Sequence, residues 1–469
     1  MSMQRNTDSR WRGPGRTPGQ RRIRNFTASA VHFAAVVALC LGFAAASASA
    51  GDAPVKLDTA FSQSVMTSGE TDRVFLRVGL RGIRPPEDIE RSPANIALVI
   101  DRSGSMQGEK IEDAREAAIM ALGRLNPYDT LSVVAFNEAV DVVLPATSAG
   151  DLPNMRRAIR HIRAQGRTAL YDGVATGIDE ALTFLDPYAV NRVILLSDGL
   201  ANVGPTSPDE IAELGRDAAA EGISITTIGL GLGYNEDLMT RLALNSDGNH
   251  AFVEHPDDLV DIFNDEFGDV FSVVGQGAEV EIHFPEGIRP LRALGRPAEI
   301  DGRNVSFEMR QIYGGQEKYV LFEVEIDGAA ARDTLRAAEV SASYTDMRTK
   351  QKTTLEDSVS LSFSDDAERI EASRNKDVLS AATMQIATER SERAVKLRDN
   401  GKVEEARKVL QDNAAYLKEK ADELAAPQLG ALAEEQESDA AAISDGSGWN
   451  KQRKQMRSRQ HKGKTQQAY

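Results

Sequence analysis

The chain has 469 residues and a formal net charge of -16, which is enough material for two to four domains with sizeable cores. Hydrophobic residues make up 41% and charged residues 27% of it, as in ordinary soluble proteins. Because nucleic acids are polyanions, the acidic balance argues against non-specific binding to nucleic acid.

Residues 1–50 oppose that charge, with seven Arg against one Asp. Three arginines between 21 and 24 precede an apolar stretch over 31–46, and Ala-Ser-Ala at 48–50 fits a cleavage site. This order predicts a signal peptide and export to the periplasm, the cell surface or the medium. An uncleaved membrane anchor is the alternative, because the stretch is only slightly shorter than a ~20-residue span. The only cysteine, Cys40, lies inside this segment, so the mature chain would form no disulfide.

The next segment, over 55–90, contains an early strand. Residues 73–80 alternate between polar and apolar side chains, the period of an amphipathic strand. It has no partner strand nearby in the sequence, so we predict that it joins the β-sandwich that follows the next domain. The domain over 92–274 would then be an insertion between strands of that sandwich.

Residues 92–274 alternate between apolar runs and segments of helical periodicity. The runs at 96–100, 131–136, 193–196, 223–228 and 251–253 predict strands, and helices are expected at 109–125, 153–164, 169–185, 208–220, 236–244 and 257–271. Continuous apolar runs are typical of strands buried on both faces of a parallel sheet. The predicted fold class is therefore α/β, with a doubly wound, mostly parallel sheet and helices on both faces.

The pattern changes at about 275. Period-two runs over 278–284, 320–326, 340–344 and 359–363 predict an antiparallel β-sandwich over 275–365. Helical periodicity over 366–428, interrupted at Asn400-Gly401, predicts a helical hairpin. The rest, 429–469, is rich in Ala and Glu and then basic, and we predict a disordered tail with a basic end.

The loop after the strand at 96–100 carries oxygen-bearing side chains at alternate positions, Asp101, Ser103 and Ser105, with Gly104 permitting a tight turn. Open α/β sheets bind ligands at the carboxyl ends of their strands. Carboxylate and hydroxyl oxygens suit hard divalent cations. The loop therefore predicts a divalent-cation site that serves binding rather than catalysis.

This motif resembles the metal-ion-dependent adhesion site of von Willebrand factor A (VWA) domains, and the resemblance covers roughly 92–274. The arrangement of a β-sandwich around this domain is similar to secreted bacterial VWA proteins and, more distantly, to inter-alpha-trypsin inhibitor heavy chains. In that family a threonine from a second loop and an aspartate after a central strand complete the site. Thr168 in Gly-Arg-Thr-Ala-Leu-Tyr-Asp-Gly (166–173) and Asp198 in Leu-Leu-Ser-Asp-Gly (195–199) match them. The resemblance implies these metal ligands: Asp101, Ser103, Ser105, Thr168 and Asp198.

Such a set offers two negative charges at most, because serine and threonine hydroxyls are neutral. Mg²⁺ is the expected ion, with Mn²⁺ or Ca²⁺ as alternatives. So little protein charge leaves the ion electrophilic, with a coordination position that an incoming carboxylate can fill. The resemblance implies this mode: an Asp or Glu of a partner protein completes the coordination sphere.

Other interpretations fit the same residues less well. A calcium EF-hand over 101–112 would need glycine where Met106 stands and a helix before the loop. A phosphotransferase with Asp101 as nucleophile would need a second acid where Ser103 stands. A phosphate loop over 104–110 would need glycine at Glu109, and the glycines over 229–233 follow a late strand rather than the first strand that a dinucleotide fingerprint requires.

A metal site formed by His250 and His255 with Glu254 and Asp257 is a further alternative, and no Ser/His/Asp or Cys/His set is present. We therefore expect no enzymatic activity. The predicted function is exported, divalent-cation-dependent protein binding, in adhesion or complex assembly. The alternatives are a structural component of the cell envelope with a stabilising metal, and a chelatase-like subunit that works with an ATPase.

Overall fold

The structure is a computed structural model that describes residues 53–86, 89–328, 334–446 and 448–468. The predicted signal peptide or anchor over 1–50, including Cys40, lies outside the described residues. Within the described part of the chain, no helix is both long and apolar enough to cross a membrane.

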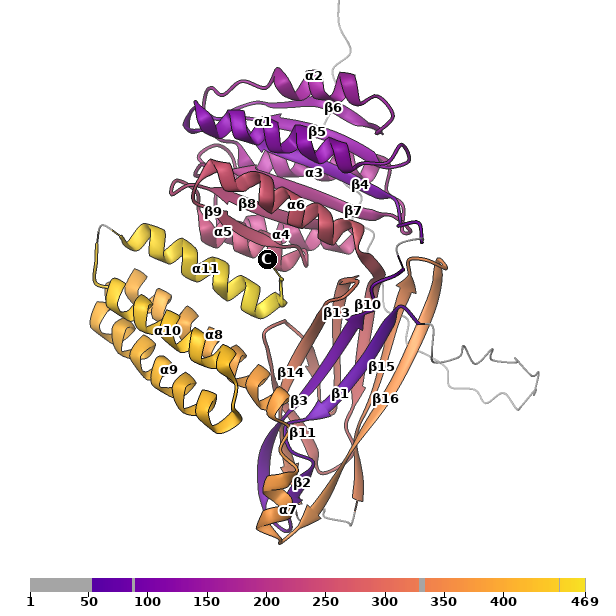
Figure 1. Ribbon diagram of the computed structural model, residues 1–469, viewed down its shortest axis with the longest axis vertical. Helices are drawn as coiled ribbons and strands as arrows, with labels where there is room; N and C mark the ends of the chain where they lie inside the picture. Colours follow the sequence, from indigo (N-terminus) through magenta and orange to yellow (C-terminus); the bar gives the residue numbers. More distant parts are fainter. Residues whose placement is uncertain (1–52, 87–88, 329–333, 447, 469) are drawn as a thin grey trace, which may run out of the picture. The chain divides into compact units, whose positions relative to one another are not determined.

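The α/β domain is built on one sheet (Figure 1). In sheet order the strands are β6 (Val140–Ser148), β5 (Thr130–Phe136), β4 (Ala94–Asp101), β7 (Val190–Ser197), β8 (Ser224–Leu230) and β9 (His250–Val253). All residues of its two central strands, β4 and β7, are buried. All neighbours pair in parallel except β5 and β6. The predicted fold class, a mostly parallel α/β sheet, is confirmed.

The edge strand β6 was not predicted from the sequence. It pairs antiparallel with β5, with register shifts along the pair, and it carries Pro145. Proline lacks the N–H that a central strand must donate, but an edge strand tolerates it. Its mixed exposure explains why no clear period of two is present in the sequence.

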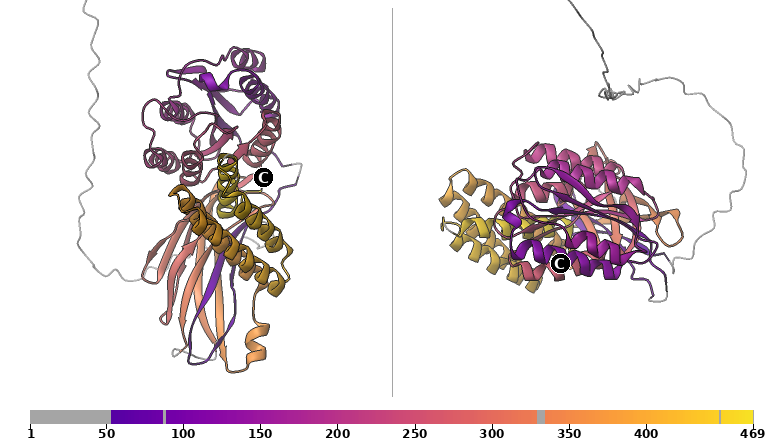
Figure 2. Two further views of the ribbon diagram at one scale, coloured as in Figure 1. Left: turned by 90° about the vertical axis from the view of Figure 1, so that its left-hand side faces the viewer. Right: turned by 90° about the horizontal axis from the view of Figure 1, so that it is seen from above.

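Helices cover both faces of this sheet, as the right-hand view of Figure 2 shows. One face is covered by α1 (Glu109–Ala121), α2 (Leu152–Arg160) and α6 (Leu259–Phe271), and the other by α3 (Leu170–Thr183), α4 (Pro208–Ala220) and α5 (Glu236–Asn245). The 3₁₀ turns are η1 (Gly104–Met106), η2 (Leu122–Arg124) and η3 (Pro256–Asp258). Each face has its own apolar core, because successive residues of a buried strand point to opposite sides.

Two antiparallel sheets pack on a common apolar core as a β-sandwich. The first has the order β1 (Val55–Phe61), β3 (Thr71–Gly82), β14 (Glu317–Asp327) and β11 (Ile288–Leu294). The second has the order β12 (Glu299–Asp301), β13 (Asn304–Tyr313), β10 (Val273–His283), β15 (Thr334–Asp346), β16 (Gln351–Ser364) and β2 (Val65–Thr67). Among the described strand pairs of these two sheets, β2 and β16 pair in parallel.

The early strand β3 belongs to the sandwich and not to the α/β sheet. Val74 lies opposite Val324 in the antiparallel pair of β3 and β14. The chain leaves the sandwich at Gly82 and returns to it at Val273. The α/β domain is therefore inserted between two strands of the sandwich.

The C-terminal region is helical throughout most of its length. Its helices are α7 (Ala367–Ala372), α8 (Lys376–Asp399), α9 (Val403–Leu424), α10 (Pro427–Ala442) and α11 (Trp449–Thr465). The turn between α8 and α9 contains Gly401 with a φ of 77°, a left-handed conformation that glycine adopts without strain.

The prediction of a disordered tail over 429–469 is wrong for the described part of that segment. Helix α10 packs Leu429 and Ala433 into a core with α8 and α9. Helix α11 lies between α5 and α8 (Figure 1), and its arginines pair with acids of other elements, as Arg453 does with Asp237 and Asp399. These long-range ion pairs, together with Met456 buried in an apolar core, hold the helix in place, and no local pattern in the sequence indicates them.

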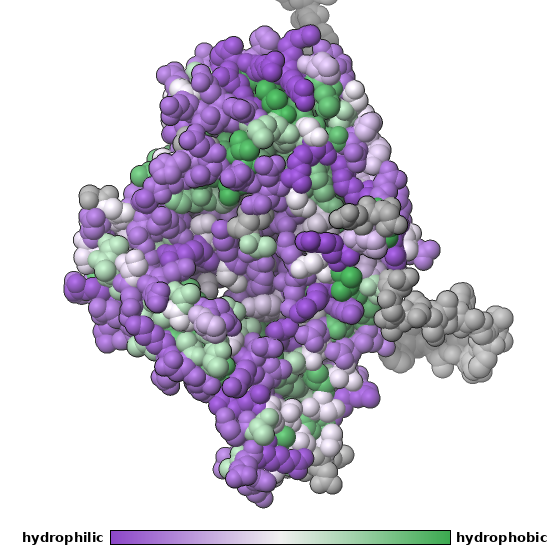
Figure 3. All heavy atoms as spheres, in the orientation of Figure 1, coloured by the Kyte–Doolittle hydropathy of each residue, from purple (hydrophilic) through white to green (hydrophobic). Residues whose placement is uncertain are grey.

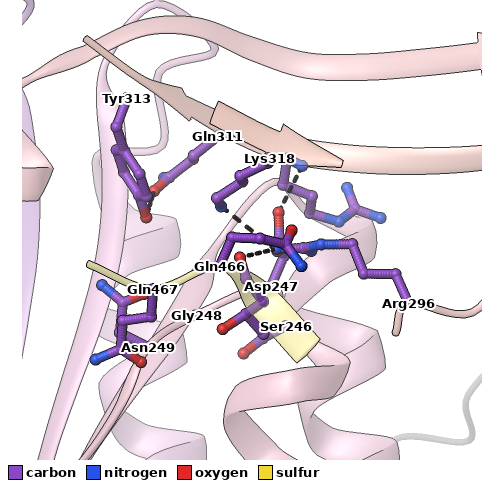
Figure 4. Close-up of polar contacts among 12 residues, drawn as sticks. Ser246, Asp247, Gly248, Asn249, Arg296, Gln311, Tyr313, Lys318, Gln466 and Gln467 are labelled. Atoms are coloured by element: carbon purple, nitrogen blue, oxygen red, sulfur yellow. Dashed lines mark hydrogen bonds and ion pairs between the residues drawn. The ribbon is translucent and has the colours of Figure 1, made fainter. Parts of the chain in front are cut away.

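A polar junction joins the α/β domain, the sandwich and the end of α11 (Figure 4). Asp247, in the turn between α5 and β9, contacts Arg296 and lies 3.7 Å from the Nζ of Lys318. Burial by itself would raise the pKa of Asp247, but Arg296 and Lys318 outweigh it and hold that pKa well below its ordinary value. Gln466 accepts a hydrogen bond from the backbone N–H of Tyr319 at 3.1 Å. Outside such junctions, the face in Figure 3 is mostly hydrophilic, with hydrophobic residues in small separate patches.

Candidate metal centre

Three loops meet at the carboxyl ends of β4 and β7. Asp101 is the last residue of β4, and Asp198 directly follows β7. These strands are parallel neighbours, so their carboxyl ends lie side by side. The loop that carries Thr168 is held against the first loop by two backbone hydrogen bonds, from Gly104 N–H to the carbonyl of Gly166 at 2.9 Å and from Gln165 N–H to the carbonyl of Arg102 at 2.7 Å.

The predicted ligands of the first and third loops form one hydrogen-bonded group. The hydroxyls of Ser103 and Ser105 lie 3.1 Å apart, and the Ser105 hydroxyl donates to Oδ1 of Asp198 at 2.7 Å. Oδ1 of Asp101 accepts from the Ser103 N–H at 2.7 Å. Oδ2 of Asp101 accepts from the Ser197 hydroxyl at 2.5 Å. Ser197 therefore orients Asp101.

Thr168 lies at the same place. Its N–H donates to the side-chain oxygen of Asn202 at 3.0 Å, and its carbonyl accepts from the N–H of Asn202 at 3.1 Å. A Cβ built on Gly199 would lie 3.1 Å from Oγ1 of Thr168 and 3.3 Å from Oδ2 of Asp101. The two oxygens therefore border one small space, which a larger residue at 199 would partly fill. The structure brings all five predicted residues together.

Burial dominates the electrostatics of Asp101. Loss of solvent raises the pKa of this carboxyl to about 6, although hydrogen bonds from Ser197 and Ser103 oppose the shift and the neighbouring Asp198 adds to it. A buried carboxylate beside another carboxylate is costly without a compensating cation. A divalent cation bound beside Asp101 would reduce that cost.

These residues fit a small, hard divalent ion. Their donors are two carboxylates and three hydroxyls, all oxygen, with no soft ligand among them. Asp101, Ser103, Thr168 and Asp198 are buried, and Ser105 is exposed at the rim. The space beside Gly199 lies between two of these oxygens.

The alternative metal sites do not assemble. Among the described residues, no group of three or more His, Cys, Asp or Glu is placed to hold a metal. His250 is buried, and its Nδ1 pairs with the Thr227 hydroxyl at 2.8 Å, whereas His255 is largely exposed. Glu112, the last ligand of a supposed EF-hand, is also exposed and lies near Arg115.

The glycine-rich segment over 229–233, which begins at the end of β8, forms a wall of this site and does not resemble a nucleotide loop. A Cβ on Gly233 would lie 2.5 Å from the backbone oxygen of Asp198, and a Cβ on Gly229 would lie 2.2 Å from the ring of Tyr234. Glycine at these two positions lets the loop approach Asp198 and lets the Tyr234 ring pack beneath it.

Sequence reasoning missed three residues of this centre: Ser197, Asn202 and Lys110. Ser197 was adjacent to a predicted ligand in Leu-Leu-Ser-Asp-Gly, so the segment itself was the available signal. Asn202 follows the same loop and has no pattern of its own. Lys110 lies in the first turn of α1, where helix side chains lean back toward the preceding loop, and its ammonium contacts the Asp198 carboxylate.

The domain therefore has an open α/β sheet and a site lined by oxygen atoms. The site lies at the topological switch point of the sheet, between β4 and β7. A model of the von Willebrand factor type A domain matches residues 95–265, so the chain contains a VWA domain. The family assignment from the sequence is confirmed.

Similar proteins support this assignment. YfbK of Escherichia coli strain K12 is 26% identical over 275 residues, which are 57% of this chain and 48% of YfbK. Inter-alpha-trypsin inhibitor heavy chain H3 of Rattus norvegicus is 32% identical over 176 residues, 36% of this chain and 19% of the heavy chain. The chain therefore spans about half the length of YfbK and a fifth of the heavy chain.

The solved structure of a von Willebrand factor type A protein from Catenulispora acidiphila has a TM-score of 0.64 at 16% identity, over 81% of this chain and 90% of that one. This likeness concerns the fold. VWA domains generally mediate protein–protein binding or adhesion, and they often bind a divalent metal.

Proposed function

We propose that the protein is a non-enzymatic binding protein whose site holds a divalent cation, preferably Mg²⁺, and captures a partner through an Asp or Glu carboxylate. The observation that carries the proposal is the convergence of Asp101, Ser103, Ser105, Thr168 and Asp198 at one rim. All five side chains present oxygen donors to one place, so we infer that the carboxylates and hydroxyls act as metal ligands and that the site serves binding.

Each residue has a distinct task in this proposal. Asp101, oriented by Ser197, supplies a fixed carboxylate, and the three hydroxyls supply neutral oxygens. Asp198 approaches from the neighbouring strand. A bound Mg²⁺ supplies a Lewis-acidic centre that accepts a further oxygen. Because Ser105 lies at the exposed rim, the outer side of the site is where a partner carboxylate would arrive.

We also propose that the protein acts outside the cytoplasm. The support is the order of basic, apolar and small-residue segments over 1–50. Adhesion or complex assembly at the cell envelope fits such a location. Removing the first fifty residues should leave the protein in the cytoplasm, as cell fractionation would show.

A capture experiment tests the binding function. The full chain and its Asp101→Ala variant are immobilised and exposed to envelope extract with Mg²⁺ or with a chelator. We expect the unmodified chain to retain certain proteins only when Mg²⁺ is present. We expect the Asp101→Ala variant not to retain these proteins. The same proteins retained by the variant, or in chelator, would contradict the proposal. If Mg²⁺ raises the melting temperature but changes no capture, the metal is structural.

A further inference from the structure

The proposed metal centre contains a cationic side chain in addition to its five proposed ligands. Lys110 is the second residue of α1, and its Nζ contacts Oδ2 of Asp198. The same Nζ lies 3.4 Å from the backbone oxygen of Ser105. The Asp198 side chain is fully buried, whereas that of Lys110 is 32% exposed. The ammonium thus enters the rim from the solvent side and neutralises a buried carboxylate.

The position of the ammonium is defined by the surrounding loops. Oδ1 of Asp198 is used by the Ser105 hydroxyl at 2.7 Å, which leaves Oδ2 to Lys110. On the other side lies Gly231, with a φ of 68°, where a Cβ would be 3.7 Å from Nζ. Lys110 is therefore packed between the first loop, the third loop and the glycine-rich wall.

We propose that Lys110 is a built-in counter-ion that sets the charge of the metal centre. The proposal rests on the proposed function. Asp101 and Asp198 bring two negative charges and Lys110 brings one positive charge. A divalent ion then leaves the centre with one positive charge in excess, which one partner carboxylate neutralises. Without Lys110, the same ion would be fully neutralised by the protein.

Two opposite effects follow for a variant that lacks this charge. A neighbouring ammonium repels a divalent cation and shares a carboxylate with it, so its removal should tighten Mg²⁺ binding on the order of tenfold. Its removal should also weaken the binding of a carboxylate to the loaded centre, because the excess positive charge is lost. A purely structural lysine would not move these two affinities in opposite directions.

The test uses the full chain with Lys110→Gln, Lys110→Arg and a control, Lys352→Gln. Lys352 lies on the sandwich, largely exposed, and pairs with Glu279, so the control makes the same change in net charge away from the site. Calorimetric titration with Mg²⁺ should give about tenfold tighter binding for Lys110→Gln, and unchanged binding for Lys110→Arg and the control. Equal or weaker binding by Lys110→Gln would overturn the inference.

A second measurement uses acetate as the carboxylate probe and Mn²⁺ as the ion. Acetate that binds to the loaded centre displaces Mn²⁺-bound water, and water-proton relaxation measures this displacement. The displacement should require several-fold more acetate for Lys110→Gln than for the control. Unchanged or tighter acetate binding would overturn the assignment of excess charge. If the unmodified chain binds neither ion, the proposed function itself fails. If the unmodified chain binds these ions and only the Lys110→Gln results differ from those expected, the proposed role of Lys110 is wrong and the proposed function stands.

Discussion

At the scale of single residues, the proposed site depends most on Asp101. Replacing it with Ala removes a carboxylate whose burial is costly, together with the acceptor for Ser103 N–H and Ser197. We expect Mg²⁺ affinity to fall at least about 100-fold, while the folded domain persists because the site lies at loop ends. Calorimetry measures the first effect and circular dichroism the second. Undiminished Mg²⁺ affinity in this variant would exclude Asp101 as a ligand.

A substitution at Gly233 tests whether the glycine-rich wall of the same site positions Asp198. Gly233→Ala would place a Cβ 2.5 Å from the backbone oxygen of Asp198, so that oxygen or the loop must shift. We expect weaker Mg²⁺ binding, on the order of tenfold, because metal sites tolerate little displacement of their ligands. The control is Gly123→Ala, where a Cβ would meet nothing within 4 Å. Equal Mg²⁺ affinities for the two variants would show that the wall does not position Asp198.

The sequence identified the five proposed ligands because their spacing and order follow the family. It left out Ser197, although this residue stands next to a predicted ligand, and it left out Lys110, because the roles of both depend on the meeting of loops far apart in the chain. The contact between Lys110 and Asp198 spans 88 positions. Family motifs thus identify the groups proposed to touch the ion, whereas the groups that orient or neutralise them appear only in three dimensions.

At the scale of elements, α11 is held to α5 by buried charges. Nζ of Lys454 lies 2.7 Å from Glu236 and 2.9 Å from the backbone oxygen of Tyr234, and it is almost completely buried. Lys454→Met should lower the free energy of unfolding by about 3 kcal/mol, because a buried carboxylate loses a partner and a carbonyl loses its donor. Urea denaturation measures this.

Lys451 on the same helix provides the comparison. It pairs with Glu254, and both side chains are substantially exposed, so Lys451→Met should cost less than about 1 kcal/mol. Similar losses for the two variants would mean that α11 is not anchored by its buried charge.

Elements with a strong period could be predicted, and those fixed by long-range partners could not. The buried strands β4 and β7 and the amphipathic strand β3 have clear patterns in the sequence. Strand β6 has mixed exposure and contains Pro145. Helix α11 is so basic that its order depends on acids of α5 and α8, and composition alone therefore favoured disorder.

At the scale of the whole molecule, the junction of α11 with the α/β domain makes stability depend on pH. Burial, together with repulsion from Arg296 and Lys464, lowers the pKa of His461 to about 3, although its hydrogen bond to Gly248 opposes this. The folded protein keeps His461 neutral, whereas the unfolded chain protonates it below a pH of about 6.5. Stability is therefore lost as pH falls from 6.5 toward 3.

His461→Gln should remove this part of the acid sensitivity. Through His461, the free energy of unfolding of the unmodified chain should fall by about 2 kcal/mol between pH 7 and pH 5. The total fall should be smaller by this amount in the variant. Urea midpoints at the two pH values measure the difference. An equally steep loss in the variant would show that His461 is not held neutral in the folded protein.

In the proposed function, five side chains hold one divalent ion at the ends of β4 and β7. Anomalous diffraction from crystals grown with Mn²⁺ tests it most directly. We expect one strong peak bounded by the oxygens of Asp101, Ser103, Ser105, Thr168 and Asp198, with a coordination position open to solvent. An empty rim, or a peak elsewhere in the domain, would contradict it.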